Sequence, residues 1–393
     1  MSASVLICPY ARLTWGHLTR CLALAEALDA RGGRVRFACP SEARPRIEAA
    51  GFEHVPLVGM ARQELLMPAG STRAAAAARR WLADELAAAR ACLRAAAPDV
   101  VVTDLQPLVN VAAALDAVPS ASVLNLELLT TPLGWWLPAL ERLLGELDVP
   151  RWAARRLFGD ALVVADTPSA LGLRDLPPDQ AARIAASVRE LRFVGPILGE
   201  LPRRRVPAGR PRPEVIVSLG GSRKTRVADI VAGCAAVDAD LVVVAPHPSD
   251  ELAQAADAVR RSGRRSGRRV KVVELLPDFA ARLAEADALI THGGHGTLSL
   301  AAALAVPTLV IPETPEQEIN ARRLHGVGAV AIGSRSRRAL HVTVGDQLAA
   351  LLRDRAGDPV RARLARSLAS YDGAGDAALV VGRLAEAPPR AGP

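Results

Sequence analysis

A glycine-rich turn in the C-terminal half carries the strongest chemical signal of the sequence. The apolar run 288–291 is followed by His292-Gly293-Gly294-His295-Gly296-Thr297, and an apolar helical stretch then begins. Glycines at a strand-to-helix turn let backbone N–H groups approach an anion closely, and the helix N-terminus adds about half a positive charge. The two histidines and the threonine hydroxyl add side-chain donors. We predict an anion-binding turn, with a tight turn that only relieves steric crowding as the alternative.

A second glycine-rich turn follows the first apolar run of the same half. The run 215–218 predicts a strand, and it ends in Leu219-Gly220-Gly221-Ser222. The carboxyl ends of parallel strands share one edge of a sheet, so we expect the two turns on that edge. Two such turns together suit a diphosphate.

Carboxylate and amide side chains follow the apolar run 308–311. This segment contains Glu316, Gln317 and Asn320 within Pro312-Glu313-Thr314-Pro315-Glu316-Gln317-Glu318-Ile319-Asn320-Ala321. Such groups hydrogen-bond well to vicinal hydroxyls. An ordinary polar helix start, with acidic residues at its positive end, is the alternative.

Short apolar runs alternate with Ala-rich helical stretches along most of the chain. In the first half we expect strands at 5–8, 35–38, 100–103 and 120–124, and helices at 17–30, 41–50, 72–97 and 107–115. In the second half we expect strands at 215–218, 241–245, 270–273, 288–291 and 308–311, and a last helix at 374–385. This alternation predicts parallel sheets covered on both faces, in two doubly wound α/β domains.

The length of 393 residues fits two such domains. We place the N-terminal domain at 1–200 and the C-terminal domain at 213–370. The Pro- and Arg-rich segment 201–212 is the predicted linker, and 371–393 forms a final helix and tail. The ligands should bind at the carboxyl ends of the strands, in a cleft between the two domains.

The net charge of +8 and the pI near 10.0 first suggest a polyanion as partner. However, twelve positive charges lie in two short segments, 203–212 and 260–271, so the rest of the chain is net acidic. Glycine, proline and serine punctuate both segments, which predicts solvated loops. We therefore expect no nucleic acid as partner, although contact with a membrane surface or an anionic acceptor stays open. A nucleic-acid-binding protein remains a rival hypothesis, and the oligomeric state is left open.

The five cysteines form no C-x-x-C pair, which argues against a zinc site or a disulfide framework. No signal peptide and no apolar run long enough to span a membrane are recognisable. We expect a cytoplasmic protein without a bound metal or cofactor. The D-x-D match at Asp238–Asp240 could suggest a metal-held diphosphate. It precedes an expected strand, however, so it should lie at the edge of the sheet away from the ligands.

The motifs of the C-terminal half together resemble the donor-binding signature of GT-B glycosyltransferases. The resemblance is closest to the bacterial natural-product and UDP-glycosyltransferase type, and more distant to the lipid-linked N-acetylglucosaminyltransferase of cell-wall synthesis. His292, Gly294, Gly296 and Thr297 match its first part, and Glu316, Gln317, Asn320 and Ala321 match its second. The segment 275–279, with Leu276 and Phe279, lies where the family has its base-binding loop. Glu316, where Asp is commoner, and His295, often Ala or Trp in the family, are departures.

In the N-terminal half the resemblance is looser and centres on Gly16-His17. The family's Gly-His at this position supplies a catalytic base, and an Asp that often pairs with it matches Asp104. A neutral imidazole can take the proton of an acceptor hydroxyl, and a carboxylate behind it fixes its tautomer. A polar or capping His17 and an N-cap role for Asp104 are the alternatives. All five tryptophans lie in this half, so Trp15, Trp135 and Trp136 are candidates for an acceptor pocket.

The resemblance implies a GT-B fold and an inverting, metal-independent hexosyltransferase. Its donor would be a UDP- or dTDP-sugar, held by the C-terminal domain, and its acceptor a small-molecule hydroxyl held by the N-terminal domain. A nucleotide-sugar hydrolase of the same fold is the main alternative, because the run Gly16-His17-Leu18-Thr19-Arg20-Cys21 also resembles the opening of such enzymes. The base, the sugar and the acceptor cannot be named from the sequence.

Overall fold

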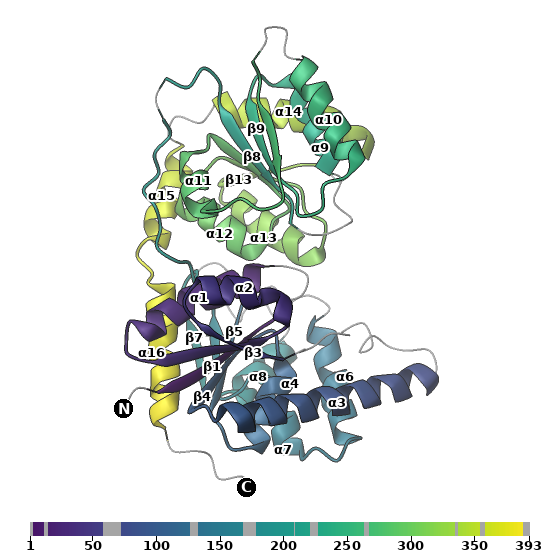
Figure 1. The fold of residues 1–393 in the computed structure, drawn as a ribbon, viewed down its shortest axis with the longest axis vertical. Coiled ribbons are helices and arrows are strands. Elements are labelled where there is room, and N and C mark those ends of the chain that lie inside the picture. The colour runs from purple at the N-terminus through teal and green to yellow at the C-terminus, as the bar shows by residue number, and fades with distance from the viewer. Residues whose placement is uncertain are drawn as a thin grey trace. The chain divides into compact units, whose positions relative to one another are not determined.

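The structure is a computed structural model, and it describes residues 3–11, 15–57, 72–125, 133–167, 178–207, 209–220, 227–262, 267–334, 337–353 and 358–387. The chain divides into two compact units. The first comprises residues 1–199 and 371–393, and the second comprises residues 200–370. Each unit is a doubly wound α/β domain, as the alternation of the sequence predicts (Figure 1).

The first unit is built on a seven-stranded parallel sheet in the order β3-β2-β1-β4-β5-β6-β7. Its strands are β1 (Ser4–Pro9), β2 (Arg34–Cys39), β3 (Glu53–Pro56), β4 (Val100–Asp104), β5 (Ser120–Leu124), β6 (Ala161–Val164) and β7 (Glu190–Phe193). Its helices are α1 (Gly16–Asp29), α2 (Arg44–Ala49), α3 (Thr72–Ala96), α4 (Pro107–Leu115), α6 (Leu133–Gly145), α7 (Arg151–Ala154), α8 (Pro178–Ser187) and α16 (Gly373–Glu386), with a short 3-10 turn at Ser41–Ala43.

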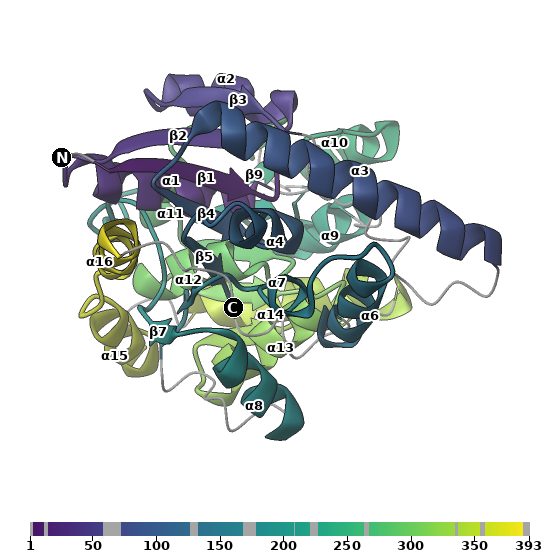
Figure 2. The ribbon, with the colours of Figure 1, turned by 90° about the horizontal axis from the view of Figure 1, so that it is seen from below.

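Side chains alternate across this sheet and so form two cores. Val5 and Ile7 of β1 pack with α1, α2 and α16, whereas Leu6 and Cys8 of the same strand pack with α3, α4, α6 and α7. Both faces of the sheet are therefore dry, which explains why its strands are continuous apolar runs. The long helix α3 crosses one face of the sheet beside α4 (Figure 2).

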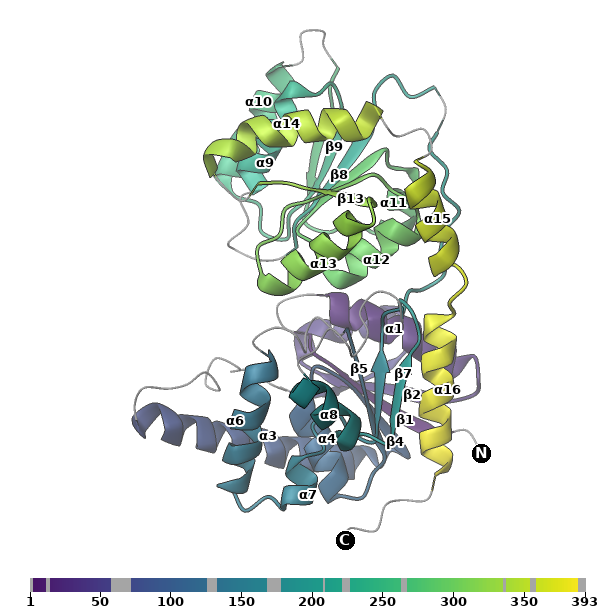
Figure 3. The ribbon, with the colours of Figure 1, turned by 180° about the vertical axis from the view of Figure 1, so that it is seen from behind.

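The second unit is built on a six-stranded parallel sheet in the order β10-β9-β8-β11-β12-β13. Its strands are β8 (Glu214–Ser218), β9 (Asp240–Val244), β10 (Val270–Val273), β11 (Ala288–Thr291), β12 (Thr308–Val310) and β13 (Val330–Ile332). Its helices are α9 (Val227–Gly233), α10 (Asp250–Ser262), α11 (Phe279–Glu285), α12 (His295–Ala303), α13 (Pro315–Gly326), α14 (Arg337–Arg353) and α15 (Pro359–Leu368), with a 3-10 turn at Cys234–Ala236. Helices α9, α10 and α14 cover one face, and α11, α12 and α13 cover the other (Figure 3).

Residues 371–393, expected as a separate helix and tail, group with the first unit. Helix α16 packs on α1 and against β4, β5 and β6. Gly373 allows this return, because a Cβ there would lie 2.2 Å from the carbonyl oxygen of Pro196. Five side chains of α16 belong to the same core as Val5 and Ile7: Ala377, Ala378, Val380, Val381 and Leu384.

Candidate active site

His17 and Asp104 meet at the carboxyl edge of the first sheet. His17 is the second residue of α1, which follows β1, and Asp104 is the last residue of β4. Strands β1 and β4 are neighbours with Pro9 opposite Asp104, and the amide of Tyr10 donates to the carbonyl oxygen of Asp104 at 2.9 Å. Nδ1 of His17 lies 2.8 Å from Oδ1 of Asp104. The sequence therefore identified two residues that the fold does bring together.

The carboxylate of Asp104 also binds a residue that the sequence-based site omitted. Arg20 donates from Nη2 to Oδ1 at 2.7 Å and from Nε to Oδ2 at 2.9 Å. Arg20 lies one helical turn after His17, so both side chains leave the same face of α1. This spacing was the signal that could have found Arg20. The site is therefore a buried triad of imidazole, carboxylate and guanidinium.

Burial and charge act in opposite directions on this triad. Desolvation alone would raise the pKa of Asp104, but the charges and hydrogen bonds of Arg20 and His17 outweigh it and hold that pKa below its usual value. For the cation Arg20 burial acts in the other direction and would lower the pKa, but the charge and hydrogen bonds of Asp104 raise that pKa above its usual value. Asp104 is fully buried, whereas the side chain of His17 keeps 17% of its surface exposed. Of the three side chains the imidazole is the most exposed, and because Asp104 binds its Nδ1, Nε2 is the nitrogen left for a reacting group.

Two aromatic residues, Tyr10 and Trp15, lie between β1 and His17 in the sequence. The ring of Tyr10, in the turn after β1, meets the imidazole edge-on at 5.7 Å between centroids. Trp15, the N-cap residue of α1, is 37% exposed, and the guanidinium of Arg46 lies 4.1 Å from its ring centroid. Gly16 lies between Trp15 and His17, and a Cβ there would meet no atom of the described structure within 4 Å. Packing within the unit therefore does not require a glycine at this position.

The two glycine-rich turns lie side by side in the second unit. Strands β8 and β11 pair with Ser218 opposite Thr291, so their carboxyl ends coincide. A Cβ on Gly220 would lie 3.0 Å from Cε1 of His292, and one on Gly294 would lie 3.0 Å from Nε2 of the same ring. The imidazole of His292 is thus packed between the two turns, and glycine at both positions makes room for it. Burial lowers the pKa of His292, while the charge of Glu316 opposes this shift.

The N-terminus of α12 is built differently from that of α13. Helix α12 begins at His295, with Gly294 as N-cap and no side chain to accept from its first-turn amides. In α13, Thr314 accepts from the amide of Gln317, and Oε1 of Gln317 accepts from the amides of Thr314 and Glu313, at 3.1 and 2.8 Å. This capping box satisfies α13 internally. Of the two, α12 is the helix whose amides can serve an external anion.

The expected sugar-binding side chains cluster beside these turns. Helix α13 follows β12, the neighbour of β11, and Nδ2 of Asn320 donates to the carbonyl oxygen of Gly293 at 3.1 Å. Asn320 is buried, so its side chain supports the glycine turn from the interior of the unit. Gln317 uses its amide oxygen in the capping box, which leaves Nε2 for other contacts. Glu316, in the first turn of α13, is close enough for its charge to act on His292.

Other predicted site residues are placed less directly. Leu276 and Phe279 pack against the core beside α11, and Leu275 of the same segment is 53% exposed. His295, Gly296 and Thr297 form the first turn of α12. Gly221 and Ser222 lie outside the described residues. Trp135 and Trp136 fall within α6, but their side chains are likewise not among those described.

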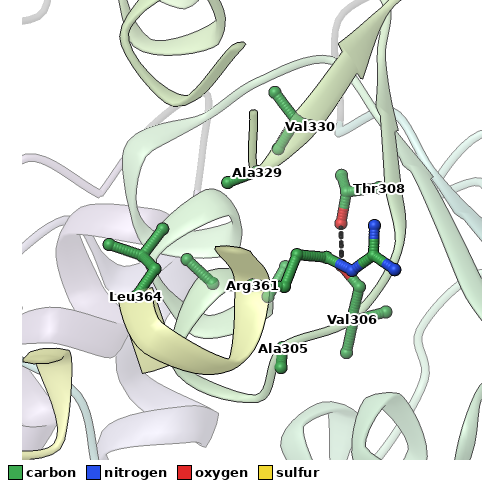
Figure 4. A pocket seen from close by; sticks show the side chains of 9 residues that line it. Ala305, Val306, Thr308, Ala329, Val330, Arg361 and Leu364 are labelled. Carbon is green, nitrogen blue, oxygen red and sulfur yellow. Dashed lines mark hydrogen bonds between the residues drawn. The ribbon is translucent and has the colours of Figure 1, made fainter. Parts of the chain in front are cut away.

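One pocket of the second unit is unrelated to these groups. It is a small hollow at the start of β12, between α12 and α15 (Figure 4). Thr308 in this pocket donates to Val306, and Arg361 is paired with Asp358. The start of β12 is the amino edge of the sheet, opposite to the glycine turns. Asp240 likewise begins β9 and binds Arg269, which confirms that the D-x-D match lies at the amino edge.

Half of the basic residues in the two Arg-rich segments have partners within the second unit. Arg204 donates to the carbonyl oxygens of Leu283, Ala284 and Ala286 at the end of α11. Arg268 donates to those of Cys234, Ala235 and Ala239. Of the twelve basic residues, six have such internal partners: Arg204, Arg210, Arg212, Arg260, Arg268 and Arg269. Much of the local basicity therefore serves the fold.

All five cysteines are free thiols. Within the described ranges, no helix combines the length and apolarity needed to cross a bilayer. In the same part of the chain, no group of three or more His, Cys, Asp or Glu side chains is arranged to hold a metal ion.

Comparison with known proteins finds a family that matches part of the C-terminal half and relatives that match most of the chain. Residues 228–376 match the family described as Erythromycin biosynthesis protein CIII-like, C-terminal domain. A PGL/p-HBAD biosynthesis glycosyltransferase of Mycobacterium tuberculosis is 25% identical over 364 residues, which cover 80% of this chain and 77% of that protein. Zeaxanthin glucosyltransferase of Pseudescherichia vulneris is 30% identical over 188 residues, 47% of this chain and 42% of the relative.

Solved structures extend the likeness to nearly the whole chain. The glycosyltransferase SnogD from Streptomyces nogalater superposes with a TM-score of 0.67 at 24% identity, over 98% of this chain and 100% of that one. The glycosyltransferase VinC, solved in complex with dTDP, superposes with a TM-score of 0.63 at 21% identity, over 98% and 99%. The matched domain and the relatives show that this chain is a glycosyltransferase, and the solved structures show that it has the GT-B fold.

Proposed function

We propose that the protein transfers a sugar from a nucleoside diphosphate sugar to a hydroxyl of a small natural-product or glycolipid acceptor, with inversion and without a metal ion. The hydrogen-bonded pair of His17 and Asp104 is the observation that carries this proposal. It provides a base, partly exposed, at the edge of the sheet where ligands of such folds bind. The names of the relatives, a glycosyltransferase of PGL/p-HBAD biosynthesis and a zeaxanthin glucosyltransferase, support the acceptor class.

The base acts through the nitrogen that Asp104 leaves unused. Nδ1 of His17 carries its proton toward Asp104, so Nε2 is the lone-pair nitrogen that accepts the proton of the acceptor hydroxyl. The acceptor oxygen then bonds to the anomeric carbon, and the bond from that carbon to the diphosphate oxygen breaks, with its electron pair leaving on the nucleoside diphosphate. A single displacement of this kind inverts the anomeric carbon. Asp104 stabilises the imidazolium that forms.

The second unit supplies groups for the departing diphosphate. The amides of the first turn of α12 and the turn at Gly220 lie around His292, and the helix dipole favours negative charge there. Backbone donors fixed in this way stabilise developing charge without reorganising. This supports a reaction in which no metal ion is needed at the phosphates. The dTDP in the VinC structure supports a UDP- or dTDP-sugar as donor.

The carboxylate of Glu316 and the remaining amide group of Gln317 are the groups proposed to bind the hydroxyls of the sugar. Both lie in the first turn of α13, beside the glycine turn after β11. A carboxylate accepts from hydroxyls, and Nε2 of Gln317 donates to them. Replacing Glu316 by Asp shortens this reach, so Glu316→Asp should change the ranking of donor sugars.

The proposal is tested first with a thermal-shift panel of nucleoside diphosphates, because a bound ligand stabilises the folded chain by mass action. Sugar derivatives of the nucleoside diphosphate that stabilises the protein are then incubated with acceptor alcohols and phenols. Products are measured by mass spectrometry in wild type and His17→Ala. We expect donor binding in both proteins but transfer only in wild type. Full transfer by His17→Ala would overturn the assignment of the base. Donor cleavage without acceptor, as fast as transfer, would instead identify a nucleotide-sugar hydrolase.

A further inference from the structure

Arg20 is a buried charge beside the reacting imidazole that the reaction described above does not use. Its guanidinium binds both oxygens of Asp104, and Nη1 lies 3.5 Å from Oδ1 of Asn125. The side chain keeps only 9% of its surface exposed. Asp104 ends β4, Asn125 follows β5, and Arg20 comes from α1, so one guanidinium joins three elements behind His17.

We propose that Arg20 is a positioning residue that holds the carboxylate of Asp104, and through it the imidazole of His17, in place and balances the charge of that carboxylate. This inference rests on the proposed function, since it concerns the same base. It assigns Arg20 no contact with either substrate.

The hydrogen bonds of Asp104 leave little freedom to its carboxylate. Oδ1 accepts from Nδ1 of His17 and from Nη2 of Arg20, while Oδ2 accepts from Nε of Arg20, and Sγ of Cys21 lies 3.8 Å away. A planar guanidinium fork fixes both the plane and the direction of the carboxylate it binds. The imidazole that donates to Oδ1 is thereby oriented as well. Lysine, which has no such fork, would keep the charge and lose this orientation.

The charges around His17 decide how readily it takes a proton. Five such groups surround it or its partners: Tyr10 in the turn after β1, Arg20 and Cys21 on α1, Asp104 on β4, and Asp166 after β6, which acts on Arg20. Asp104 favours the imidazolium. Arg20 opposes it, because its Nη2 lies 3.3 Å from Nδ1 of His17 and so places a second positive charge beside the ring. Carboxylate and guanidinium together are neutral, so the imidazole does not experience an isolated buried anion.

Removing the guanidinium charge should therefore make the site easier to protonate. In Arg20→Gln the site carries one negative charge, and the first proton it binds neutralises that charge, whether it resides on His17 or on Asp104. We expect the acid limb of the kcat/KM profile, and the titration of His17 followed by ¹⁵N NMR, to move to higher pH. Arg20→Lys should leave both within about 0.3 unit and lower kcat. Arg31→Gln, at an exposed position in the turn that follows the same helix, is the matched control and should behave as wild type.

The NMR signal of His17 is assigned by its loss in His17→Gln among the seven histidines. If Arg20→Gln does not fold, Asp104→Asn is compared with the double variant Arg20→Gln, Asp104→Asn. The pKa of His17 should be lower by about 1 unit in the single variant, where an unpaired cation remains. An unchanged pKa and acid limb in Arg20→Gln, or equal pKa values in the Asn pair, would overturn the proposal. The NMR measurement needs no turnover, so it tests the role of Arg20 separately from the role of His17 as the base. The role of His17 is tested by whether His17→Ala still transfers sugar.

Discussion

His17 and Asp104 are 87 positions apart in the chain, yet their side chains are joined by a hydrogen bond of 2.8 Å. The distance is short because β1 and β4 are neighbours in the sheet, although β2, β3 and α3 separate them in sequence. The pair is therefore a product of strand order, and its function can be tested from the carboxylate side.

Replacing Asp104 by Asn should reduce transfer by about 10²- to 10⁴-fold, because the amide no longer fixes the imidazole tautomer or stabilises the imidazolium. The change appears in kcat at saturating donor and acceptor. Asp84→Asn, at an exposed position of α3, is the control and should retain full activity. A wild-type kcat in Asp104→Asn would show that the carboxylate does not assist His17.

The same substitution should change how stability depends on pH. The folded pKa of Asp104 lies below the unfolded value of 3.8, so as pH falls the unfolded chain takes up the proton first. Asp104 thus stabilises the fold above about pH 5, and this contribution is lost on acidification. Urea unfolding from pH 7 to pH 3 should show a shallower loss of stability in Asp104→Asn, together with a cost of about 3–5 kcal/mol at pH 7 from the unpaired Arg20. Parallel curves for the two proteins would contradict this assignment.

The glycine turn after β11 offers a matched pair of substitutions. A Cβ on Gly296 meets nothing within 4 Å of the described structure, so Gly296→Ala should fold normally. If the diphosphate approaches the first turn of α12, that methyl group should weaken donor binding by about 10-fold or more. Gly293 has φ +94°, and its Cβ would lie 2.9 Å from Val310, so Gly293→Ala should cost about 1–3 kcal/mol of stability. Thermal unfolding and donor titration separate the two effects. Unchanged donor affinity in Gly296→Ala would argue against an anion at this turn.

Gln317 has two roles that substitutions can separate. Gln317→Glu keeps an oxygen that accepts from the amides of Thr314 and Glu313, but it loses the Nε2 donor. Gln317→Ala loses both, and with the cap about 1 kcal/mol of stability. We expect donor KM to rise in both variants while only Gln317→Ala unfolds at lower temperature. A donor KM equal to wild type in Gln317→Glu would show that Gln317 serves only as a helix cap.

Arg203 and Arg204 are adjacent but make different contributions. Arg204 donates to three carbonyl oxygens at the end of α11, where a cation also interacts favourably with the helix dipole, whereas Arg203 is exposed. Arg204→Ala should lower stability by about 1.5–3 kcal/mol, and Arg203→Ala by less than about 0.5 kcal/mol. Denaturant unfolding of both variants measures this. If both variants lost equally little stability, Arg204 would be only a solvated surface charge like Arg203.

The parallel sheets and most of their strands were predictable because both faces of each sheet are buried. Continuous apolar runs such as 100–103 and 288–291 then stand out against the Ala-rich helices. Edge strands carry a weaker signal: β3 and β7 each contain charged residues, and β13 has only three residues. Strand β6, Ala161–Val164, is a continuous buried run that the spacing argument should have found.

Site residues were predictable where the residue type itself indicates a role, such as a base or a carboxylate. They were not predictable where the role depends on contacts with other side chains or with the backbone. His17 and Asp104 stand at strand-to-helix turns, and Arg20 could have been inferred from its spacing to His17. The engagement of the Gln317 oxygen in a capping box, and the burial of Asn320 behind Gly293, depend on rotamers and packing. Neither is encoded in the residue types alone. Likewise, a cluster of arginines does not reveal that Arg268 is buried against backbone carbonyls.

The return of the chain to the first unit has a consequence for biosynthesis. On the ribosome, residues 1–199 emerge before the second unit, yet their core lacks the apolar face of α16 until residues 373–386 have been made. The second unit, in contrast, is contiguous and can fold as soon as residue 370 is available. A nascent or prematurely terminated chain would therefore display an uncovered face of the sheet that holds His17, a natural target for chaperones and proteases. The portion of the chain synthesised first is thus the last to reach its native state.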